Sequence, residues 1–209
     1  MAEDWLDRWE KGRTGWHEVD GNSGLKAHWR ASSGSVLVPL CGKTLDLVWL
    51  AKRGHEVVGV ELAEKAIHEF FAEQSLDYHE ASDRLLPSFV ADDLPITIVC
   101  GDYFDFVSKP FGALYDRGAI VAVDPAERPR YVAHARSLLS RDADILIITL
   151  EYDQHVVQGP PFALHPQELA GYWSDLERVE VRDDIDNCPP KFIKAGLTEI
   201  HEVTWCSSR

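Results

Sequence analysis

Ser35-Val-Leu-Val-Pro-Leu-Cys-Gly42 is a short β-branched run closed by a turn, and this pattern predicts a buried strand. Residues 44–53 place their apolar side chains mostly on one helical face, so we expect a helix that ends near Gly54. The run at residues 56–60 predicts the second strand, and residues 63–74 predict the second helix. This alternation is typical of βαβ units, which build parallel sheets.

The alternation continues through the middle of the chain. Further strands are expected at residues 96–100, 112–115 and 144–150, with a helix at 126–139. No element is predicted for the polar stretch 77–93. The result is a largely parallel sheet with helices on both faces.

Both ends of the chain differ from this middle part. Residues 3–10 and 25–30 read as short helices separated by a Gly-rich loop, and this segment precedes the sheet and is free to cover a site. Residues 176–185 and 197–205 alternate apolar and polar side chains and are joined by Asn187-Cys-Pro-Pro190. They predict an antiparallel pair at the edge of the sheet.

Composition narrows the classes of function. Of the 209 residues, 45% are hydrophobic and 27% are charged, as in an average globular chain. Lys and Arg number 21 against 35 Asp and Glu, a net charge of −14, so binding to nucleic acid or to an anionic membrane is not expected. The acidic start Met1-Ala-Glu-Asp-Trp5 resembles no export signal, so we expect a cytoplasmic protein. The four cysteines show no C-x-x-C spacing, and no metal site is predicted.

An acidic residue follows the second strand. Ligands of open parallel sheets bind at the carboxyl ends of the strands. The turn after the first strand has one glycine, Gly42, instead of the G-x-G-x-x-G that a dinucleotide requires. Glu61 stands where an acid commonly binds ribose hydroxyls, which favours a nucleoside ligand without a pyrophosphate. The alternative is a solvated acid or a charge at a helix N-terminus.

Other strand ends carry further candidates. Asp102 and Tyr103 follow the third strand and suit an adenine edge, although Asp102 could equally cap the next turn. Arg117 follows the fourth strand and could bind a ligand carboxylate, orient an acceptor, or pair with Asp116 or Glu61. Four of the seven tryptophans lie in the first 29 residues, where they are either a structural staple or a lid over an apolar or cationic ligand.

These motifs, taken in order, resemble the thiopurine S-methyltransferase family. The resemblance rests on the following pieces, which span nearly the whole chain: Trp5-x3-Trp9, Gly15-Trp16-His17, Pro39-Leu-Cys-Gly-Lys43, Gly54-His55-x3-Gly59-Val-Glu61, Asp102-Tyr-Phe104, Asp116-Arg-Gly-Ala119, Pro190-Lys-Phe192 and Gly196-Leu197. It implies a three-layer Rossmann-like class I methyltransferase, with a mostly parallel seven-stranded sheet that contains one antiparallel strand. The whole chain, 1–209, would form one domain, with residues 1–31 as a helical lid segment and 32–209 as the sheet core.

The resemblance also implies a cofactor and its contacts. The cofactor would be S-adenosylmethionine, with S-adenosylhomocysteine as its product. The cofactor-binding positions of the family fall on Trp9, Leu40, Glu61, Asp102, Tyr103 and Arg117. Trp16 replaces the phenylalanine usual in the family and would lie over the methyl acceptor. Arg117 would also orient the acceptor, as the one catalytic candidate.

The expected reaction is methyl transfer to the sulfur of an aromatic or heterocyclic thiol, and also to selenium or tellurium compounds in detoxification. An ionised thiol needs little acid–base machinery, because a thiolate is already the nucleophile. We expect a monomer with a small-molecule partner. Three alternatives stay open from the residues alone: a small thiol or halide methyltransferase, a nicotinamide-dependent oxidoreductase, and a binding module without turnover.

Overall fold

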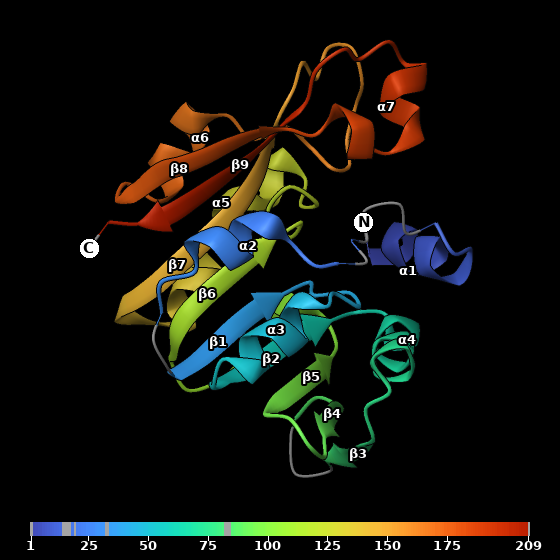
Figure 1. Cartoon of the computed structure of the whole chain (residues 1–209), viewed down its shortest axis with the longest axis vertical. Helices are drawn as coiled ribbons and strands as arrows, with labels where there is room; N and C mark the ends of the chain where they lie inside the picture. Colours follow the sequence, from blue (N-terminus) through green and yellow to red (C-terminus); the bar gives the residue numbers. More distant parts are fainter. Residues whose placement is uncertain (1, 14–17, 19, 32–33, 82–84, 209) are drawn as a thin grey trace.

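The computed structural model describes the chain except for residues 1, 14–17, 19, 32–33, 82–84 and 209 (Figure 1). Its α-helices are α1 (Ala2–Glu10), α2 (Ser23–His28), α3 (Asp46–Lys52), α4 (Glu64–Gln74), α5 (Arg128–Ser137), α6 (Pro166–Tyr172) and α7 (Pro190–Lys194). Its strands are β1 (Gly34–Pro39), β2 (His55–Glu61), β3 (Tyr78–Ala81), β4 (Ser88–Ala91), β5 (Ile96–Cys100), β6 (Phe111–Arg117), β7 (Leu139–Glu151), β8 (Leu176–Asp183) and β9 (His201–Ser207). Single 3₁₀ turns are η1 (Tyr103–Asp105), η2 (Pro125–Glu127) and η3 (Ile185–Asn187).

All strands join in one sheet with the order β3-β4-β5-β2-β1-β6-β7-β9-β8. The strands β5, β2, β1, β6 and β7 are mutually parallel, and β9 runs antiparallel to both β7 and β8. The expected set of seven strands with one antiparallel member is therefore present, from β5 to β8. The expected total of seven needs a correction, because the β3–β4 hairpin adds two antiparallel strands next to β5.

The sequence missed this hairpin because its strands are only four residues long and lie within an acidic stretch. Ser88 and Phe89 are buried where β4 pairs with β5. The burial of this strand therefore comes from its neighbour, and the local sequence shows no alternation that would predict it. Helix α6 was also missed, and the expected helix 126–139 is split into η2 and α5. The predicted antiparallel pair at the edge is confirmed as β8 and β9, although η3 and α7 lengthen its connection.

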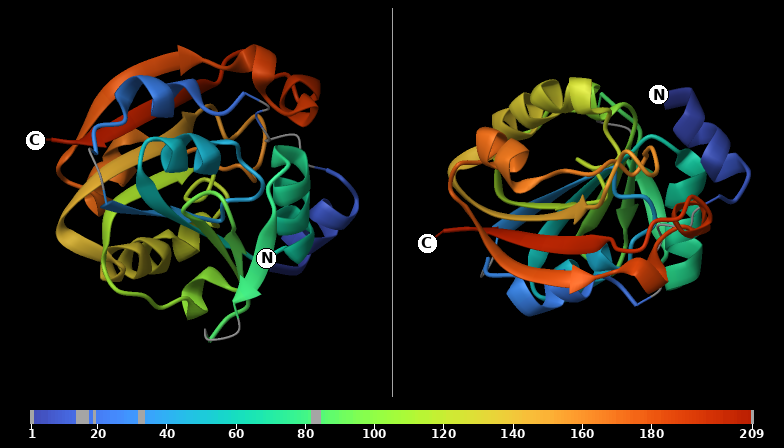
Figure 2. Two further views of the ribbon diagram at one scale, coloured as in Figure 1. Left: turned by 60° about the horizontal axis from the view of Figure 1, so that its bottom comes forward. Right: turned by 90° about the horizontal axis from the view of Figure 1, so that it is seen from above.

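Hydrophobic side chains cover both faces of the sheet. Successive side chains of a strand point to opposite faces, and in β1 Val36 and Val38 pack with α2, α3 and α4, whereas Leu37 packs with α5 and α6. Figure 2 shows these two groups of helices on opposite sides of the sheet, with α1 outside α4. This packing fixes the carboxyl ends of the parallel strands along one edge.

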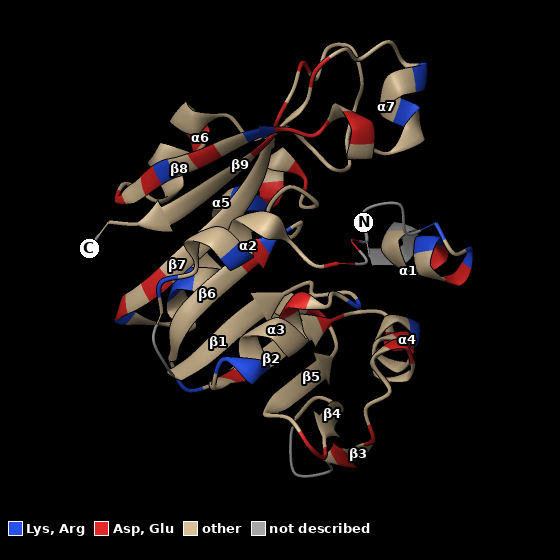
Figure 3. Ribbon diagram, in the orientation of Figure 1, with Lys and Arg blue, Asp and Glu red and all other residues tan. Residues whose placement is uncertain are grey.

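Charged side chains of both signs are interspersed along α1, α4 and β8 (Figure 3). Within the described part of the chain, no helix combines the length and the apolar composition needed to cross a membrane.

Candidate functional site

A pocket of about 830 Å³ lies at the carboxyl ends of the parallel strands. Six of the residues proposed from the sequence line it together: Trp9, Leu40, Glu61, Asp102, Tyr103 and Arg117. They come from α1, from the ends of β2 and β6, and from the segments that follow β1 and β5. The seventh candidate, Trp16, lies outside the described residues. Residues that were chosen because they follow parallel strands are far apart in the sequence, and they meet in this pocket.

Glu61 ends β2 with a carboxylate that is 93% buried, since its exposed fraction is 7%. The Gly42 N–H donates to Oε2 at 2.7 Å, and the Ala63 N–H donates to Oε1 at 2.8 Å. Burial raises the pKa of Glu61, and the backbone donors act against this rise. Glu61 is therefore no solvated acid. Glu61 also accepts a hydrogen bond from Ala63, the N-cap of α4, so the alternative of a charge at a helix N-terminus is partly correct.

The turn after β1 brings α1 against the pocket. Leu40 and Gly42 have φ values of +47° and +54°, a region that L side chains rarely adopt. A Cβ at Gly42 would lie 3.3 Å from Cζ2 of Trp9, so the ring packs directly on this backbone. Trp9 is buried and also packs on Ala63 and Ala66 at the start of α4. One indole ring thus joins α1 to two walls of the pocket.

Asp102 and Tyr103 form the wall after β5. Asp102 accepts a hydrogen bond from the Phe104 N–H at 2.9 Å, so it does cap η1, as the alternative held. Tyr103 is buried against Tyr131 and His134, with ring centroids at 5.3 and 4.8 Å. Its hydroxyl has no hydrogen-bond partner among the described residues, and burial raises its pKa strongly. A buried hydroxyl of this kind is a candidate donor to a ligand.

Arg117 ends β6 and forms an ion pair with Glu18 at 2.8 Å. The sequence had offered Asp116 and Glu61 as its pairing partners. The Asp116 carboxylate instead accepts hydrogen bonds from the Tyr131 hydroxyl at 2.7 Å and from the Ile120 N–H at 3.1 Å, and thereby holds the loop after β6.

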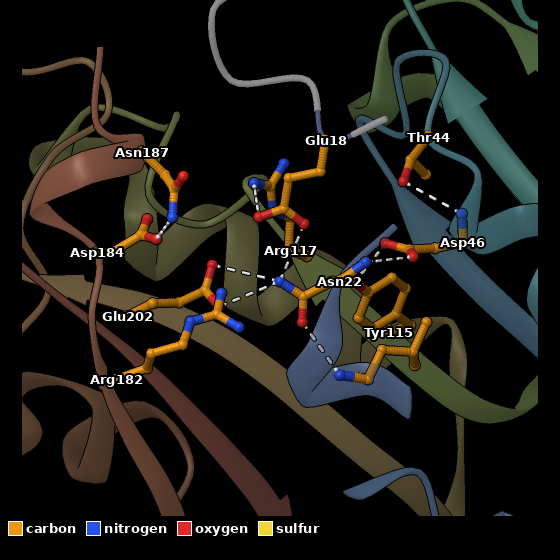
Figure 4. A network of polar contacts seen from close by, with 11 residues as sticks. Glu18, Asn22, Thr44, Asp46, Tyr115, Arg117, Arg182, Asp184, Asn187 and Glu202 are labelled. Carbon is orange, nitrogen blue, oxygen red and sulfur yellow. Dashed lines mark hydrogen bonds and ion pairs between the residues drawn. The ribbon is translucent and has the colours of Figure 1, made fainter. Parts of the chain in front are cut away.

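Sequence reasoning missed a polar network beside Arg117 (Figure 4). It contains Glu18, Asn22, Asp46, Tyr115, Arg182 and Glu202, and all except Asn22 line the pocket. Its members come from the segment before α2, from α3, and from β6, β8 and β9. The signals in the sequence were weak: Asn22 stands in the Gly-rich loop, and Glu202 is an acid in the last strand.

Known proteins match the whole chain. The thiopurine S-methyltransferase family matches residues 1–209. A thiopurine S-methyltransferase of Pseudomonas fluorescens (strain Pf0-1) is 40% identical over 211 residues, covering 97% of this chain and 96% of the relative. One of Bordetella petrii is 41% identical over 213 residues, covering 98% of this chain and 96% of the relative.

The chain belongs to the thiopurine S-methyltransferase family. The family assignment made from the motifs is thereby confirmed, and with it the prediction of an S-adenosylmethionine-dependent methyltransferase that acts on a small molecule. The individual site residues stay predictions, because these matches concern the chain as a whole.

Solved structures support the fold. A Burkholderia thailandensis 1,6-didemethyltoxoflavin-N1-methyltransferase, crystallised with 1,6-didemethyltoxoflavin and S-adenosylhomocysteine, has a TM-score of 0.63 at 19% identity, covering 100% of this chain and 87% of that chain. An arsenic(III) S-adenosylmethionine methyltransferase of Chlamydomonas reinhardtii has a TM-score of 0.61 at 14% identity, covering 91% of this chain and 71% of that chain. The predicted methyltransferase fold is confirmed.

Proposed function

We propose that this member of the family transfers a methyl group from S-adenosylmethionine to the sulfur of aromatic or heterocyclic thiols. The observation that carries the proposal is the placement of Glu61 and Arg117 in one pocket. Glu61 offers a buried carboxylate at the end of β2, and Arg117 offers a cation at the end of β6. The pocket therefore has one part suited to a nucleoside and another suited to an acceptor.

The residues present fit the cofactor. The Gly42 and Ala63 N–H groups each donate to a different Glu61 oxygen, and the carboxylate keeps further acceptor capacity for ribose hydroxyls. The adjoining wall carries the Asp102 carboxylate and the Tyr103 hydroxyl, and the latter has no hydrogen-bond partner among the described residues. Both groups suit the adenine side of the cofactor. Trp5 and Trp9 line the pocket with aromatic rings, which attract a sulfonium cation. S-adenosylmethionine, when bound, supplies an electrophilic methyl group.

The chain has to hold the acceptor and exclude water. An aromatic thiol ionises easily, so the site needs a group that orients a thiolate more than it needs a base. Arg117 supplies a guanidinium at that position, and its pairing with Glu18 fixes its direction. Alignment in a dry pocket favours a reaction in which an anion and a cation neutralise each other.

The finer predictions belong to this proposal. Residues 1–31 would form a lid on a single domain that spans 1–209, and the docking of Trp9 on Gly42 supports this role. Trp16 would contact the acceptor. A monomeric state, a cytoplasmic location, selenium or tellurium acceptors and a role in detoxification are proposed with it, on the family resemblance and the composition.

An acceptor panel tests the proposal. Purified protein is incubated with methyl-labelled S-adenosylmethionine and 6-mercaptopurine, thiophenol, small alkyl thiols, selenite or iodide, and the products are followed by mass spectrometry. We expect aromatic and heterocyclic thiols to dominate. Turnover of only small thiols or iodide would replace the proposal with a small thiol or halide methyltransferase. Binding of S-adenosylhomocysteine without any turnover would reveal a binding module.

A further inference from the structure

Asn22 joins two carboxylates of the polar network to the start of α2. It is completely buried, with an exposed fraction of 0%. Its Nδ2 donates to Glu18 Oε2 at 3.2 Å and to Glu202 Oε1 and Oε2 at 3.1 and 3.3 Å (Figure 4). One neutral amide thus contacts two carboxylates that belong to distant parts of the chain.

The two carboxylates need such a donor, because they repel each other. Glu18 pairs with Arg117 at 2.8 Å, and Glu202 accepts from an Arg182 nitrogen at 2.6 Å. Burial raises the pKa of Glu202 and the charge of Glu18 adds to this rise, whereas Arg117, Arg182 and the Asn22 amide lower the pKa. Glu202 in turn favours the charged form of Arg117. The amide therefore stabilises both acids beside the guanidinium without adding charge.

The other end of Asn22 is anchored as well. Its Oδ1 accepts from the Leu25 N–H at 3.1 Å as the N-cap of α2, and its own N–H donates to Asp46 Oδ1 at 2.8 Å. Asp46 also accepts from the Tyr115 hydroxyl at 2.7 Å. These bonds fix the direction of the side chain, so that its amide hydrogens stay aimed at the two carboxylates.

Two glycines allow this close packing. Gly21 has a φ of +69°, and a Cβ there would lie 2.6 Å from Asp46 Oδ1. A Cβ at Gly24 would lie 2.4 Å from Thr204 Oγ1 on β9. Side chains at positions 21 and 24 would clash with Asp46 and Thr204, so the two glycines allow Asn22 to lie between α3 and β9.

We propose that Asn22 is a positioning residue of the acceptor side of the pocket, where its amide fixes the Glu18 and Glu202 carboxylates around the Arg117 guanidinium. This inference rests on the proposed function. Asn22 acts through Arg117, because its own side chain does not line the pocket. Loss of the amide hydrogens lets the two carboxylates separate, and the guanidinium loses its fixed direction.

The variant Asn22→Ser separates this role from the capping of α2. A serine hydroxyl caps a helix N-terminus about as well as asparagine, but it lacks the two amide hydrogens. An alanine in Asn22→Ala lacks the capping oxygen as well as the amide hydrogens. We expect kcat/KM for the acceptor to fall about 10- to 100-fold in both variants, because small misplacements at a reacting centre are costly. The affinity for S-adenosylhomocysteine, measured by calorimetry, should fall by a smaller factor, at most about fivefold, because Arg117 is also predicted to contact the cofactor. Tm should fall further in Asn22→Ala.

The matched control is Gln158→Ser, which removes a side-chain amide outside the residues that line the pocket. Gln158 is exposed, and its amide donates to the Gln154 carbonyl oxygen at 2.8 Å. We expect its kinetics to match the wild type within about twofold. An equal loss in Gln158→Ser, or a loss of S-adenosylhomocysteine affinity in Asn22→Ser as large as its loss of kcat/KM, would overturn the inference.

A double-mutant cycle shows whether Asn22 acts through Arg117. In an Arg117→Lys background the rigid guanidinium is absent, so Asn22→Ser should cost little more. Full additivity of the two losses would refute the link.

If Asn22→Ser does not fold, Glu18→Gln tests the same contact from its other end and should lower acceptor kcat/KM while S-adenosylhomocysteine still binds. A wild type that methylates no thiol overturns the proposed function and this inference together, whereas an active wild type with an unaffected Asn22→Ser overturns the inference alone.

Discussion

Glu61 is buried at the end of β2, and this burial raises the pKa of its carboxyl group. The N–H groups of Gly42 and Ala63 oppose this effect, and they also tie the turn after β1 to the start of α4. A side chain held in this way is ready to accept hydrogen bonds from a ligand without reorganising.

Glu61→Ala should therefore weaken the binding of S-adenosylhomocysteine. Loss of charge-assisted hydrogen bonds costs about 1.5–3 kcal/mol, or roughly 10- to 150-fold in Kd. Calorimetric titration measures the change. Glu56→Ala is the control, because Glu56 is an exposed acid of the same strand. Unchanged affinity in Glu61→Ala would remove this residue from the cofactor site.

Asp116 predicts a pH dependence of stability. Burial raises the pKa of Asp116 from its ordinary value of 3.8 to about 6, although Tyr131 and the backbone donors oppose the shift. Between about pH 4 and pH 6 the folded state thus holds a proton that the unfolded state has lost, so this group lowers stability as pH rises through that range.

Asp116→Asn removes this titration. The free energy of unfolding of the variant should increase relative to that of the wild type as pH rises from about 4 to about 7, because only the wild type loses stability through this group. Urea unfolding at several pH values measures this difference. A difference that does not change with pH would show that Asp116 is charged in the folded state throughout.

Among the elements, α1 depends on one packing contact. Trp9 packs on Gly42 and on the first turn of α4. This packing of α1 requires that residue 42 has no side chain. The same contact joins the N-terminal segment to the loop that holds Glu61.

Gly42→Ala should disturb this contact. An alanine at φ +54° costs about 1–2 kcal/mol in backbone strain, and its Cβ would also press on the Trp9 ring. Gly12→Ala is the matched control, because Gly12 has a φ of +63° and open space where the Cβ would be. We expect both variants to lose stability in thermal unfolding, and only Gly42→Ala to lose S-adenosylhomocysteine affinity. Equal affinities would show that α1 docking does not affect the cofactor site.

For the whole molecule, the continuous sheet and its two covered faces predict unfolding as one unit. The pocket draws residues from α1 to β9, so a ligand that binds there stabilises the entire chain. The proposal of one domain over residues 1–209 can be tested on this basis.

Calorimetric unfolding should show a single transition. S-adenosylhomocysteine at about 100 times its Kd adds about 2.7 kcal/mol, which raises Tm by about 5–10 °C for a chain of this size. Two transitions, of which only one moves with the ligand, would indicate that the N-terminal segment or the C-terminal strands fold separately.

The parallel core and the ends of its strands could be predicted from local sequence patterns. The runs around Val36 and Val58 are rich in β-branched residues, a composition that predicts buried strands. The position of Glu61 at the end of the second strand follows from the same pattern. The motifs in their order also identified the family. The β3–β4 hairpin escaped this reasoning, because Phe89 is buried only through pairing with β5.

The partners that surround Arg117 could not be predicted in this way, because they depend on the folded arrangement of distant segments. Asn22 and Glu202 are 180 residues apart, and local spacing contains no information about a contact over that separation. Their meeting depends on the sheet order, which places β9 beside β7, and on a glycine loop that lets Asn22 approach. Strand patterns are set by short-range burial, whereas the acceptor side of the pocket arises from long-range packing.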